Sequence, residues 1–405
     1  MDLTLKSRRK LWLKAHLYLG LVAGAVFVLI GLTGSLLAFE FPLDERLNSE
    51  LMTVQSGSEN RSYLPLDVIA ASGLKALPAN GKAVSLGFSL HPGLAFELWF
   101  QQPSPAAERM ESHQIFINPY TGEVTGQRLK VDFARGWRGP LMDVVLRLHY
   151  SLAAGPVGMT VMGFIGLVLA FSVLTGLILW WPNPGKLKNA LTIKRHASPE
   201  RLNFDLHKTF GFYSSVVLLF LILSGVYMIF PDYGRGVVSV FSPVAEPYPQ
   251  FQSIVPDGAK TAIGLDRVKA ITDARFPDGE YRWIAFPADD RGVYIVAKRA
   301  SDEINGKSPF RRLWLDQYSG AIIHRRTAEG RTAGDVFVEW LYPLHSGEAF
   351  GMAGQLMVSG LGLVPLVLYV TGVIRWLHKR RAKNSVKQKA ARMQAPETVR
   401  HGKDC

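Results

Sequence analysis

The sequence predicts an α-helical membrane protein in which four transmembrane helices form two parallel helix–domain–helix repeats, with two small external α+β domains. Three observations predict it: four long stretches without a charged residue, two mixed segments between them, and residues that recur at fixed offsets in the two halves. Of the 405 residues, 48% are hydrophobic and 20% are charged, which excludes a disordered or collagen-like chain.

Each charge-free stretch is long enough to cross a bilayer. A helix rises about 1.5 Å per residue, so about 20 residues cross a hydrocarbon core of about 30 Å. The shortest stretch has 22 residues. We therefore expect transmembrane helices over residues 17–39, 152–181, 209–230 and 349–374.

Positive charge is concentrated on one side of these helices. Segments 1–16, 182–208 and 375–405 hold 21 of the 46 Lys and Arg residues and only five acids. Because cytoplasmic loops are rich in Lys and Arg, we expect a multi-pass protein of the bacterial inner membrane with both termini in the cytoplasm. The net charge of +13 then comes from the excess of Lys and Arg in the cytoplasmic segments. Membrane lipid is an expected partner, and nucleic acid is not.

The segments between the helices predict two external domains. Short apolar runs alternate with polar residues at 94–100, 113–117, 292–297 and 312–315, and turn residues follow at 118–122 and 316–320. The predicted organisation is a cytoplasmic N-terminus with the first helix (1–42), an external domain (43–148), the second helix (149–182), a cytoplasmic loop (183–206), the third helix (207–231), an external domain (232–345), the fourth helix (346–378) and a basic cytoplasmic tail (379–405).

Four histidines anchor the internal repeat. His16 and His207 are each followed by Gly at +4, a hydroxyl residue at +17 and Gly at +18. His149 and His345 are each followed by Gly at +6, +9 and +17, Thr-Gly at +26 and +27, and Trp at +31. Equivalent helices then run in the same direction, which implies a pseudo-twofold axis along the membrane normal.

This symmetry places two histidine pairs across the axis. His16 and His207 begin outward-running helices, and His149 and His345 begin inward-running ones. Two imidazoles that face each other in a helical bundle are the axial ligands of a b-type haem, so we expect two haem b groups per chain. Glycines on the same helix faces would leave room for a flat macrocycle; they are Gly20, Gly211, Gly34 and Gly225.

Other interpretations of these residues remain open. Each histidine can be a polar contact between helices, and the glycines can serve small-residue helix packing. One histidine of a pair can also hold a five-coordinate haem with an open site. If both pairs bind haem, the irons lie about 20–30 Å apart at the helical rise of about 1.5 Å per residue. That arrangement carries electrons from a quinol or a cytoplasmic reductase to an external acceptor.

Several kinds of chemistry are excluded by what the sequence lacks. The single cysteine, Cys405, leaves no ligands for structural disulfides, cysteine-rich zinc sites, iron–sulfur clusters or c-type haem. No dinucleotide-binding, P-loop, zinc-protease or serine-hydrolase motif occurs. The electron donor must therefore be a separate molecule. The Arg8-Arg9 pair resembles a twin-arginine signal, but we expect an uncleaved anchor.

The chain resembles the PepSY-associated transmembrane helix family. The motifs that carry the resemblance are H-L-Y-L-G (16–20), L-H-Y-S-L (148–152), D-L-H-K-T-F-G (205–211), L-H-S-G-E-A-F-G (344–351) and the two turns, and they cover nearly everything before about Lys383. It looks closest to the FoxB-like inner-membrane ferric-siderophore reductases. The resemblance implies external PepSY-like domains and a haem protein that reduces siderophore-bound Fe(III) in the periplasm and releases Fe(II).

A ferric siderophore would approach the external histidines, where polar and aromatic residues precede them. The substrate candidates are Trp137, Arg138, Arg147, Trp340 and Tyr342, which an interfacial aromatic belt with snorkelling Arg would also explain. The competing hypothesis is a haem-free sensor or accessory protein whose external domains bind a peptide or partner. Secondary transport is a weaker alternative, because the predicted helices contain no acidic or basic residue for ion coupling.

Overall fold

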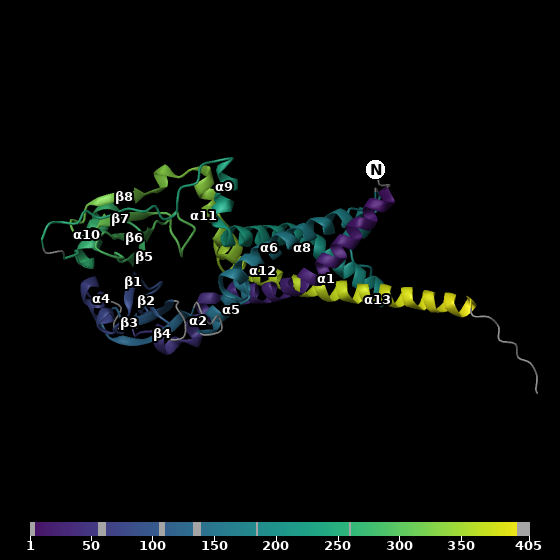
Figure 1. The fold of residues 1–405 in the computed structure, drawn as a ribbon, viewed down its shortest axis with the longest axis horizontal. Helices are drawn as coiled ribbons and strands as arrows, with labels where there is room; N and C mark the ends of the chain where they lie inside the picture. Colours follow the sequence, from purple (N-terminus) through teal and green to yellow (C-terminus); the bar gives the residue numbers. More distant parts are fainter. Residues whose placement is uncertain are drawn as a thin grey trace, which may run out of the picture. The chain divides into compact units, whose positions relative to one another are not determined.

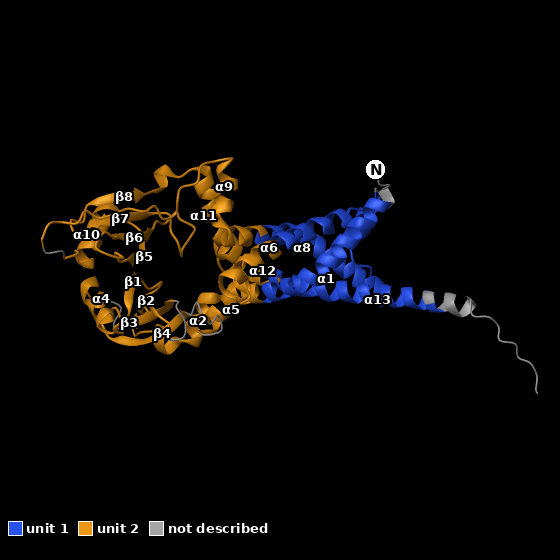
Figure 2. Ribbon diagram, viewed as in Figure 1, with its two compact units in different colours: residues 1–32, 167–222, 361–405 blue, residues 33–166, 223–360 orange. Residues whose placement is uncertain are grey.

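The computed structural model describes residues 5–55, 62–104, 110–132, 139–183, 185–258 and 261–394. The chain divides into two compact units (Figure 2). The helical unit comprises residues 1–32, 167–222 and 361–405, and the sheet unit comprises residues 33–166 and 223–360.

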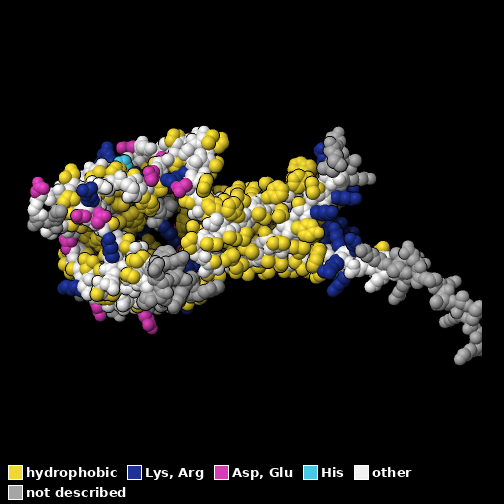
Figure 3. Space-filling model, viewed as in Figure 1, with side chains coloured by type: hydrophobic (Ala, Val, Ile, Leu, Met, Phe, Trp, Pro, Cys, Tyr) yellow, Lys and Arg dark blue, Asp and Glu magenta, His cyan; other side chains and the backbone are white. Residues whose placement is uncertain are grey.

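Four helical segments of the described chain are long and apolar enough to cross a membrane: Ser7–Leu37, Gly155–Trp180, Pro199–Ile229 and Glu348–Val386. This confirms the predicted multi-pass membrane protein. Each segment exposes large apolar side chains that water would not solvate well, among them Val22, Val157, Val216 and Leu356, which are 60–77% exposed. Figure 3 shows hydrophobic side chains along these helices, and Lys and Arg gathered near the start of α1.

The helices of these segments can be followed in Figure 1. They are α1 (Leu5–Leu37), α6 (Gly155–Trp180), α8 (Pro199–Ile229), α12 (Gly351–Gly362) and α13 (Val364–Gln394). The sequence predicted one continuous fourth helix, and the structure interrupts it at Leu363. Pro365 is the second residue of α13, and its ring excludes a hydrogen bond and crowds the preceding turn, which ends α12.

All eight strands form one antiparallel sheet of the order β4-β3-β2-β1-β5-β6-β7-β8. The two segments that the sequence presented as separate domains therefore each contribute four strands, and β1 pairs with β5 through Leu86 and Ile284. The strands are β1 (Lys82–Gly87), β2 (Phe96–Pro103), β3 (Met110–Ile117), β4 (Val124–Asp132), β5 (Glu280–Ala285), β6 (Val293–Arg299), β7 (Arg312–Asp316) and β8 (Ile322–Arg326).

Two helices supply the other side of the core, α4 (Leu66–Lys75) and α10 (Leu265–Arg275). One apolar cluster includes Ile69 of α4, Val268 of α10 and Leu86 and Ile284 of the central strands, all four fully buried. The core therefore continues across the β1–β5 junction and joins the two halves of the sheet.

The first turns of α4 and α10 cap each other. Asp67 Oδ1 accepts a hydrogen bond from the Leu265 amide at 2.5 Å, and Asp266 Oδ1 accepts one from the Leu66 amide at 2.8 Å. A helix N-terminus leaves amides without intrahelical partners and favours a negative charge nearby. Each helix thus receives its capping carboxylate from the other half of the chain.

Shorter helices lie between the membrane-spanning segments and the sheet, except α7 (Leu187–Leu191), which lies between α6 and α8. The others are α2 (Glu40–Leu47), α3 (Ser49–Met52), α5 (Leu141–Ser151), α9 (Pro231–Ser239) and α11 (Ala333–Ser346), with 3-10 turns η1 (Ala328–Gly330) and η2 (Glu348–Phe350). The sequence placed His149 and His345 at the start of transmembrane helices, and the structure places them at the ends of α5 and α11 instead.

A tight turn follows each of these two helices. Leu152 and Ala153 after α5 have φ of 52° and 55°, and Gly347 after α11 has φ of 82°. The next helix packs closely on the turn, because a Cβ at Gly158 would lie 1.9 Å from the Ser151 carbonyl oxygen and one at Gly354 would lie 2.2 Å from that of Gly347. The recurring glycine at +9 therefore permits this close approach.

Candidate functional site

The structure brings together both histidine pairs that the sequence predicted. His16 and His207, the first pair, lie in the helical unit with ring centroids 6.3 Å apart and ring planes at 79°. His149 and His345, the second pair, lie in the sheet unit with centroids 6.3 Å apart and planes at 76°. Two pairs from different helices share one geometry.

That geometry fits a single iron between two imidazoles. A metal–imidazole bond is about 2.0–2.1 Å, and an imidazole nitrogen lies about 1.1–1.2 Å from its ring centre, so two axial rings have centroids about 6.2–6.6 Å apart. Both pairs, at 6.3 Å, fall in this range. The histidines present therefore fit bis-histidine ligation.

In the first pair, hydrogen bonds orient the two rings and fix the tautomer. His16 Nδ1 lies 3.1 Å from both the Ser172 carbonyl oxygen and Thr175 Oγ1, and His207 Nδ1 lies 2.9 Å from Thr371 Oγ1. Both threonine hydroxyls donate their own proton to a helix carbonyl, so their oxygens accept from the imidazoles. Nδ1 of each histidine is then the donor, which leaves the Nε2 lone pair for a metal.

The second pair repeats this arrangement. Thr33 Oγ1 lies 3.0 Å from His149 Nδ1, and Ser224 Oγ lies 2.8 Å from His345 Nδ1. Thr33 and Ser224 are buried. Each of the four histidines therefore has a hydroxyl partner on a helix of its own half of the chain.

A glycine follows each of these hydroxyl residues and lies against the same imidazole. A Cβ would be 3.1 Å from His16 Cε1 at Gly176, 3.5 Å from His207 Cε1 at Gly372, 3.0 Å from His149 Cε1 at Gly34 and 3.5 Å from His345 Cε1 at Gly225. Each Ser/Thr-Gly dipeptide thus supplies one hydrogen bond and the space for one ring.

Gly20 and Gly211, one turn after the first pair, have open surroundings. A Cβ at Gly20 would have no atom within 4 Å, and one at Gly211 would contact only Leu368, at 3.6 Å. A side chain at either position would therefore have space around it. The hydroxyl partners of the histidines and the glycines beside the first pair were not predicted, although the repeated Ser/Thr-Gly dipeptide is the signal that marks them: Thr33, Thr175, Ser224, Thr371, Gly176 and Gly372.

A buried acid precedes each histidine of the second pair by six residues. Asp143 on α5 pairs with Lys130 Nζ at 2.9 Å, and Glu339 on α11 pairs with Arg331 at 3.1 Å. Burial raises the pKa of both carboxyl groups. Asp143 Oδ2 and Glu339 Oε1 have no hydrogen-bond partner among the described residues. The two halves thus place equivalent acids behind their histidines.

The predicted substrate residues have different positions. Trp137 and Arg138 lie outside the described residues. Arg147 is buried, and its Nη1 donates to the Lys130 carbonyl oxygen at 3.3 Å, so it lies between α5 and β4 rather than at the surface. Trp340 is 38% exposed, and Tyr342 is half-buried with Lys307 Nζ 5.1 Å above its ring.

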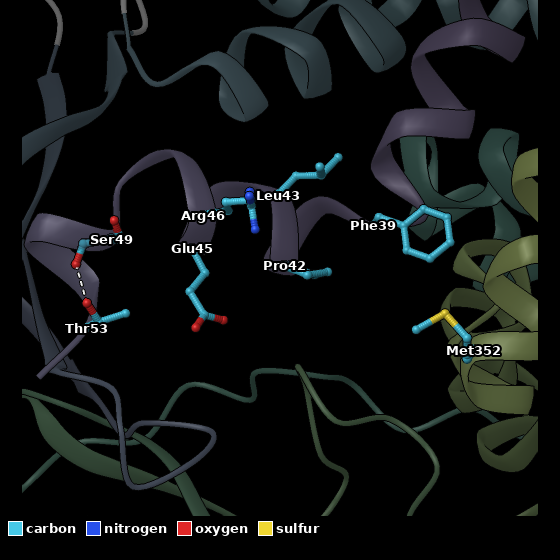
Figure 4. A pocket seen from close by; sticks show the side chains of 8 residues that line it. All are labelled: Phe39, Pro42, Leu43, Glu45, Arg46, Ser49, Thr53 and Met352. Atoms are coloured by element: carbon cyan, nitrogen blue, oxygen red, sulfur yellow. Dashed lines mark hydrogen bonds between the residues drawn. The ribbon is translucent and has the colours of Figure 1, made fainter. Parts of the chain in front are cut away.

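A cavity of about 600 Å³ opens in the sheet unit (Figure 4). Its wall combines apolar residues with an acid, a base and two hydroxyl residues: Phe39, Pro42, Leu43, Met352, Glu45, Arg46, Ser49 and Thr53. Phe39 follows Gly34 by five residues, and Met352 follows His345 by seven. The chain segments that hold the second pair therefore continue into the wall of this cavity.

The family model described as PepSY-associated TM region matches residues 13–379, which includes all four histidines and all eight strands. Among curated proteins, no relative matches the sequence.

Proposed function

The chain belongs to the family of PepSY-associated TM region proteins, and from this premise we propose that it is a haem b-dependent oxidoreductase of the bacterial inner membrane. In this proposal it passes electrons across the membrane and reduces ferric iron held by a siderophore in the periplasm. The product, Fe(II), is held poorly by the chelator and is released for uptake.

The observation that carries the proposal is the shared geometry of the two histidine pairs. Centroid separations of 6.3 Å suit one iron per pair, and the hydroxyl partners keep Nε2 free to bind it. Polar helix contacts alone do not require two imidazoles at this spacing. Haem b would supply reversible one-electron transfer when bound at each pair.

The protein's own residues would hold and tune these groups. His16 and His207 would ligate one iron, and His149 and His345 the other. The threonine and serine hydroxyls fix the ring orientation and strengthen the ligands, because a hydrogen bond from Nδ1 makes Nε2 more basic. Glycines beside each ring leave space, and the surrounding helices exclude water.

Topology gives the direction of transfer. The basic segments 1–16, 182–208 and 375–405 support cytoplasmic termini, and in this proposal the first pair lies toward the cytoplasm and the second toward the periplasm. The parallel repeat supports the same assignment, because each pair takes one histidine from each half. The electron donor would be a quinol or a cytoplasmic reductase.

We propose the sheet-unit cavity as the place where the ferric chelate docks. It has room for a small chelate, and Phe39 and Met352 continue from the segments of the second pair. Siderophore oxygens are hard ligands that prefer Fe(III), so one electron weakens the complex without breaking a covalent bond of the chelator. The side chains need only hold the chelate near the second pair.

The first test is the visible spectrum of the detergent-purified protein, oxidised and reduced by dithionite, with pyridine haemochrome quantitation. We expect sharp low-spin bands and two haem b groups per chain. His149→Ala and His16→Ala should each lose one haem. The matched control is His324→Ala, at a histidine of β8 that belongs to neither pair, and it should retain both haems. A colourless protein from haem-replete cells would favour the haem-free sensor.

The second test measures the reaction itself. Dithionite-reduced protein is mixed with a ferric hydroxamate chelate, and Fe(II) is trapped by a ferrous-specific dye. The wild type should reoxidise and form the coloured Fe(II) complex, and His149→Ala should form it much more slowly. Haem that is present but never reoxidised by ferric chelates would contradict the assigned acceptor while leaving the haem sites intact.

A further inference from the structure

Helix α9 exposes an apolar face immediately after the third membrane-spanning helix. Its stripe comprises Tyr233, Val237, Val240 and Phe241, which are 80%, 65%, 79% and 87% exposed. Tyr233 and Val237 are one turn apart on α9, and Val240 and Phe241 continue it in the turn after Ser239, where their amides donate to the carbonyl oxygens of Val237 and Val238. At about 100° per residue, the four side chains span an arc of about 100°. Exposed apolar side chains that gather in this way usually mark a contact surface.

An edge of α9 next to the apolar stripe is attached to the protein. Gly234 lies against α8, since a Cβ there would be 2.3 Å from the Tyr227 ring. Gly334 of α11 lies against the segment after α9, because a Cβ there would be 2.6 Å from the carbonyl oxygens of Ser242 and Pro243. The orientation of α9 is therefore fixed, and its apolar stripe faces away from the protein.

The contact with Tyr227 ties the start of α9 to the end of the membrane-spanning segment. Tyr227 lies two residues before the end of Pro199–Ile229, so α9 begins beside a side chain from the last turn of α8. An interfacial zone extends only about 5–8 Å beyond each face of the hydrocarbon core. A helix that packs on this turn lies within that zone.

The polar residues of α9 fit the same position. Asp232 and Arg235 form an ion pair on the side of the helix away from the stripe. Asp232 is 81% exposed, as expected for a charge that remains in water or among headgroups. Amphipathic helices at membrane surfaces bury their apolar face at the headgroup–acyl boundary and keep their charges outside it.

We propose that α9, with Val240 and Phe241, is a membrane-interfacial anchor whose apolar stripe is covered by lipid acyl chains. Continuity with α8 selects lipid rather than another protein as the occupant, because the stripe begins four residues after the membrane-spanning segment ends. The anchor is independent of the proposed redox activity, since none of its residues contacts a histidine pair.

The anchor belongs to the second half of the chain only. Helix α2 follows α1 as α9 follows α8, but its sequence is E-F-P-L-D-E-R-L, with three acids. Asp44 is buried in an ion pair with Arg128, Glu40 pairs with Lys307, and Glu45 lines the cavity. Helix α2, at the equivalent position in the first half, thus makes ion pairs and lines the cavity.

Site-directed spin labelling tests the anchor. With Cys405→Ser as background, single cysteines replace Val237, Phe241 or, as control, Ile254, which is 83% exposed in the sheet unit away from α9. The labelled proteins are reconstituted in nanodiscs of phosphatidylethanolamine and phosphatidylglycerol, and label collision rates with oxygen and with a water-soluble nickel chelate are compared. Labels at 237 and 241 should show a several-fold higher oxygen-to-nickel ratio than the label at 254.

Two results would overturn the proposal. Labels at 237 and 241 with the same oxygen-to-nickel ratio as the label at 254 would show that the stripe faces water. Spin–spin broadening at 237 and 241 that disappears on dilution with unlabelled protein would show that a second copy covers the stripe. Tyr233→Trp gives a second measurement, because brominated lipids should quench its added fluorescence only if the stripe lies at acyl-chain depth.

Discussion

The hydroxyl oxygen of Thr33 lies 3.0 Å from Nδ1 of His149, although 116 residues separate them in the sequence. The same contact joins Ser224 to His345 at 2.8 Å in the other half. A hydroxyl on one membrane-spanning helix therefore sets the orientation of an imidazole on a helix that follows the sheet segment.

Replacing Thr33 by Val should raise the midpoint potential of one haem in the proposed site. Loss of the acceptor for Nδ1–H makes the ligand less basic, which disfavours the ferric state. A net hydrogen-bond contribution of about 1 kcal/mol corresponds to about 40 mV for a one-electron couple. Potentiometric titration followed by the visible spectrum resolves the two haems.

The control is Ser35→Ala, which removes a hydroxyl two residues further along α1 that donates to the Ser359 carbonyl oxygen instead. It should leave both potentials unchanged. Equal shifts in Thr33→Val and Ser35→Ala would indicate a general disturbance of α1, and the hydrogen bond to His149 would then have no special role.

The glycines beside the second pair provide a matched comparison. A Cβ at Gly34 would lie 3.0 Å from His149 Cε1, closer than an ordinary contact, and one at Gly225 would lie 3.5 Å from His345 Cε1, an ordinary contact. Gly34→Ala should therefore displace the His149 ring and change the low-spin electron paramagnetic resonance spectrum. Gly225→Ala should resemble the wild type. In both variants, the higher helix propensity of Ala stabilises the helix by about 1 kcal/mol. Identical spectra for both variants would contradict this difference in packing.

Mutual capping of α4 and α10 should contribute to the stability of the sheet unit. Asp67→Ala or Asp266→Ala removes the carboxylate that caps the partner helix and should cost about 1–2 kcal/mol. The apparent thermal midpoint of the sheet unit, followed by circular dichroism at β-sheet wavelengths, should decrease. Asp257→Ala, at an exposed position without a cap, should leave the midpoint unchanged.

Glu97 makes stability depend on pH. Its carboxylate on β2 is half-buried and accepts hydrogen bonds from Trp99 Nε1 and Gln114 Nε2, and desolvation raises its pKa despite the attraction of Lys130 and Arg128. The folded protein then binds this proton more tightly than the unfolded chain. The resulting stability is present below the unfolded pKa of about 4.3 and is lost as pH rises through the higher folded pKa.

Glu97→Gln should therefore become more stable relative to wild type as pH increases, because the amide keeps an acceptor oxygen and carries no charge. Thermal midpoints between pH 5 and pH 8 measure the difference. Glu123→Gln, at an exposed position, is the control and should follow the wild type. A difference between Glu97→Gln and wild type that stays constant with pH would exclude a proton-linked contribution.

Hydropathy predicted the membrane spans well, because an apolar run of sufficient length has few other solutions. The predicted strand segments correspond to β2, β3, β6 and β7, whose residues are mostly buried, with a clear alternation of buried and half-buried positions in β2. Their neighbours β1 and β5 are less regular, with the patterns K-A-V-S-L-G and E-Y-R-W-I-A. The sequence therefore did not reveal that these two strands pair and join the halves into one sheet.

The histidine pairs of the candidate site were predictable because the two halves of the sequence repeat them. Four histidines at repeated offsets were enough to predict two pairs, and the structure has both. The hydroxyl partners lie more than 100 residues from their histidines, so no local pattern relates them. Arg147 was predicted as a substrate residue because it precedes His149 by two residues. Its side chain is instead buried between α5 and β4, which its position in the sequence did not reveal.

The way the two halves share the histidines and their hydroxyl partners has a consequence for biosynthesis. Every imidazole takes its hydroxyl partner from its own half, and every pair takes one imidazole from each half. While the ribosome is still translating the third helix, His16 and His149 can already be held in place by Thr175 and Thr33. Neither pair exists until the second half has been inserted, so the newly made first half presents two oriented but solitary imidazoles, and both histidine pairs form only when the second half has been made.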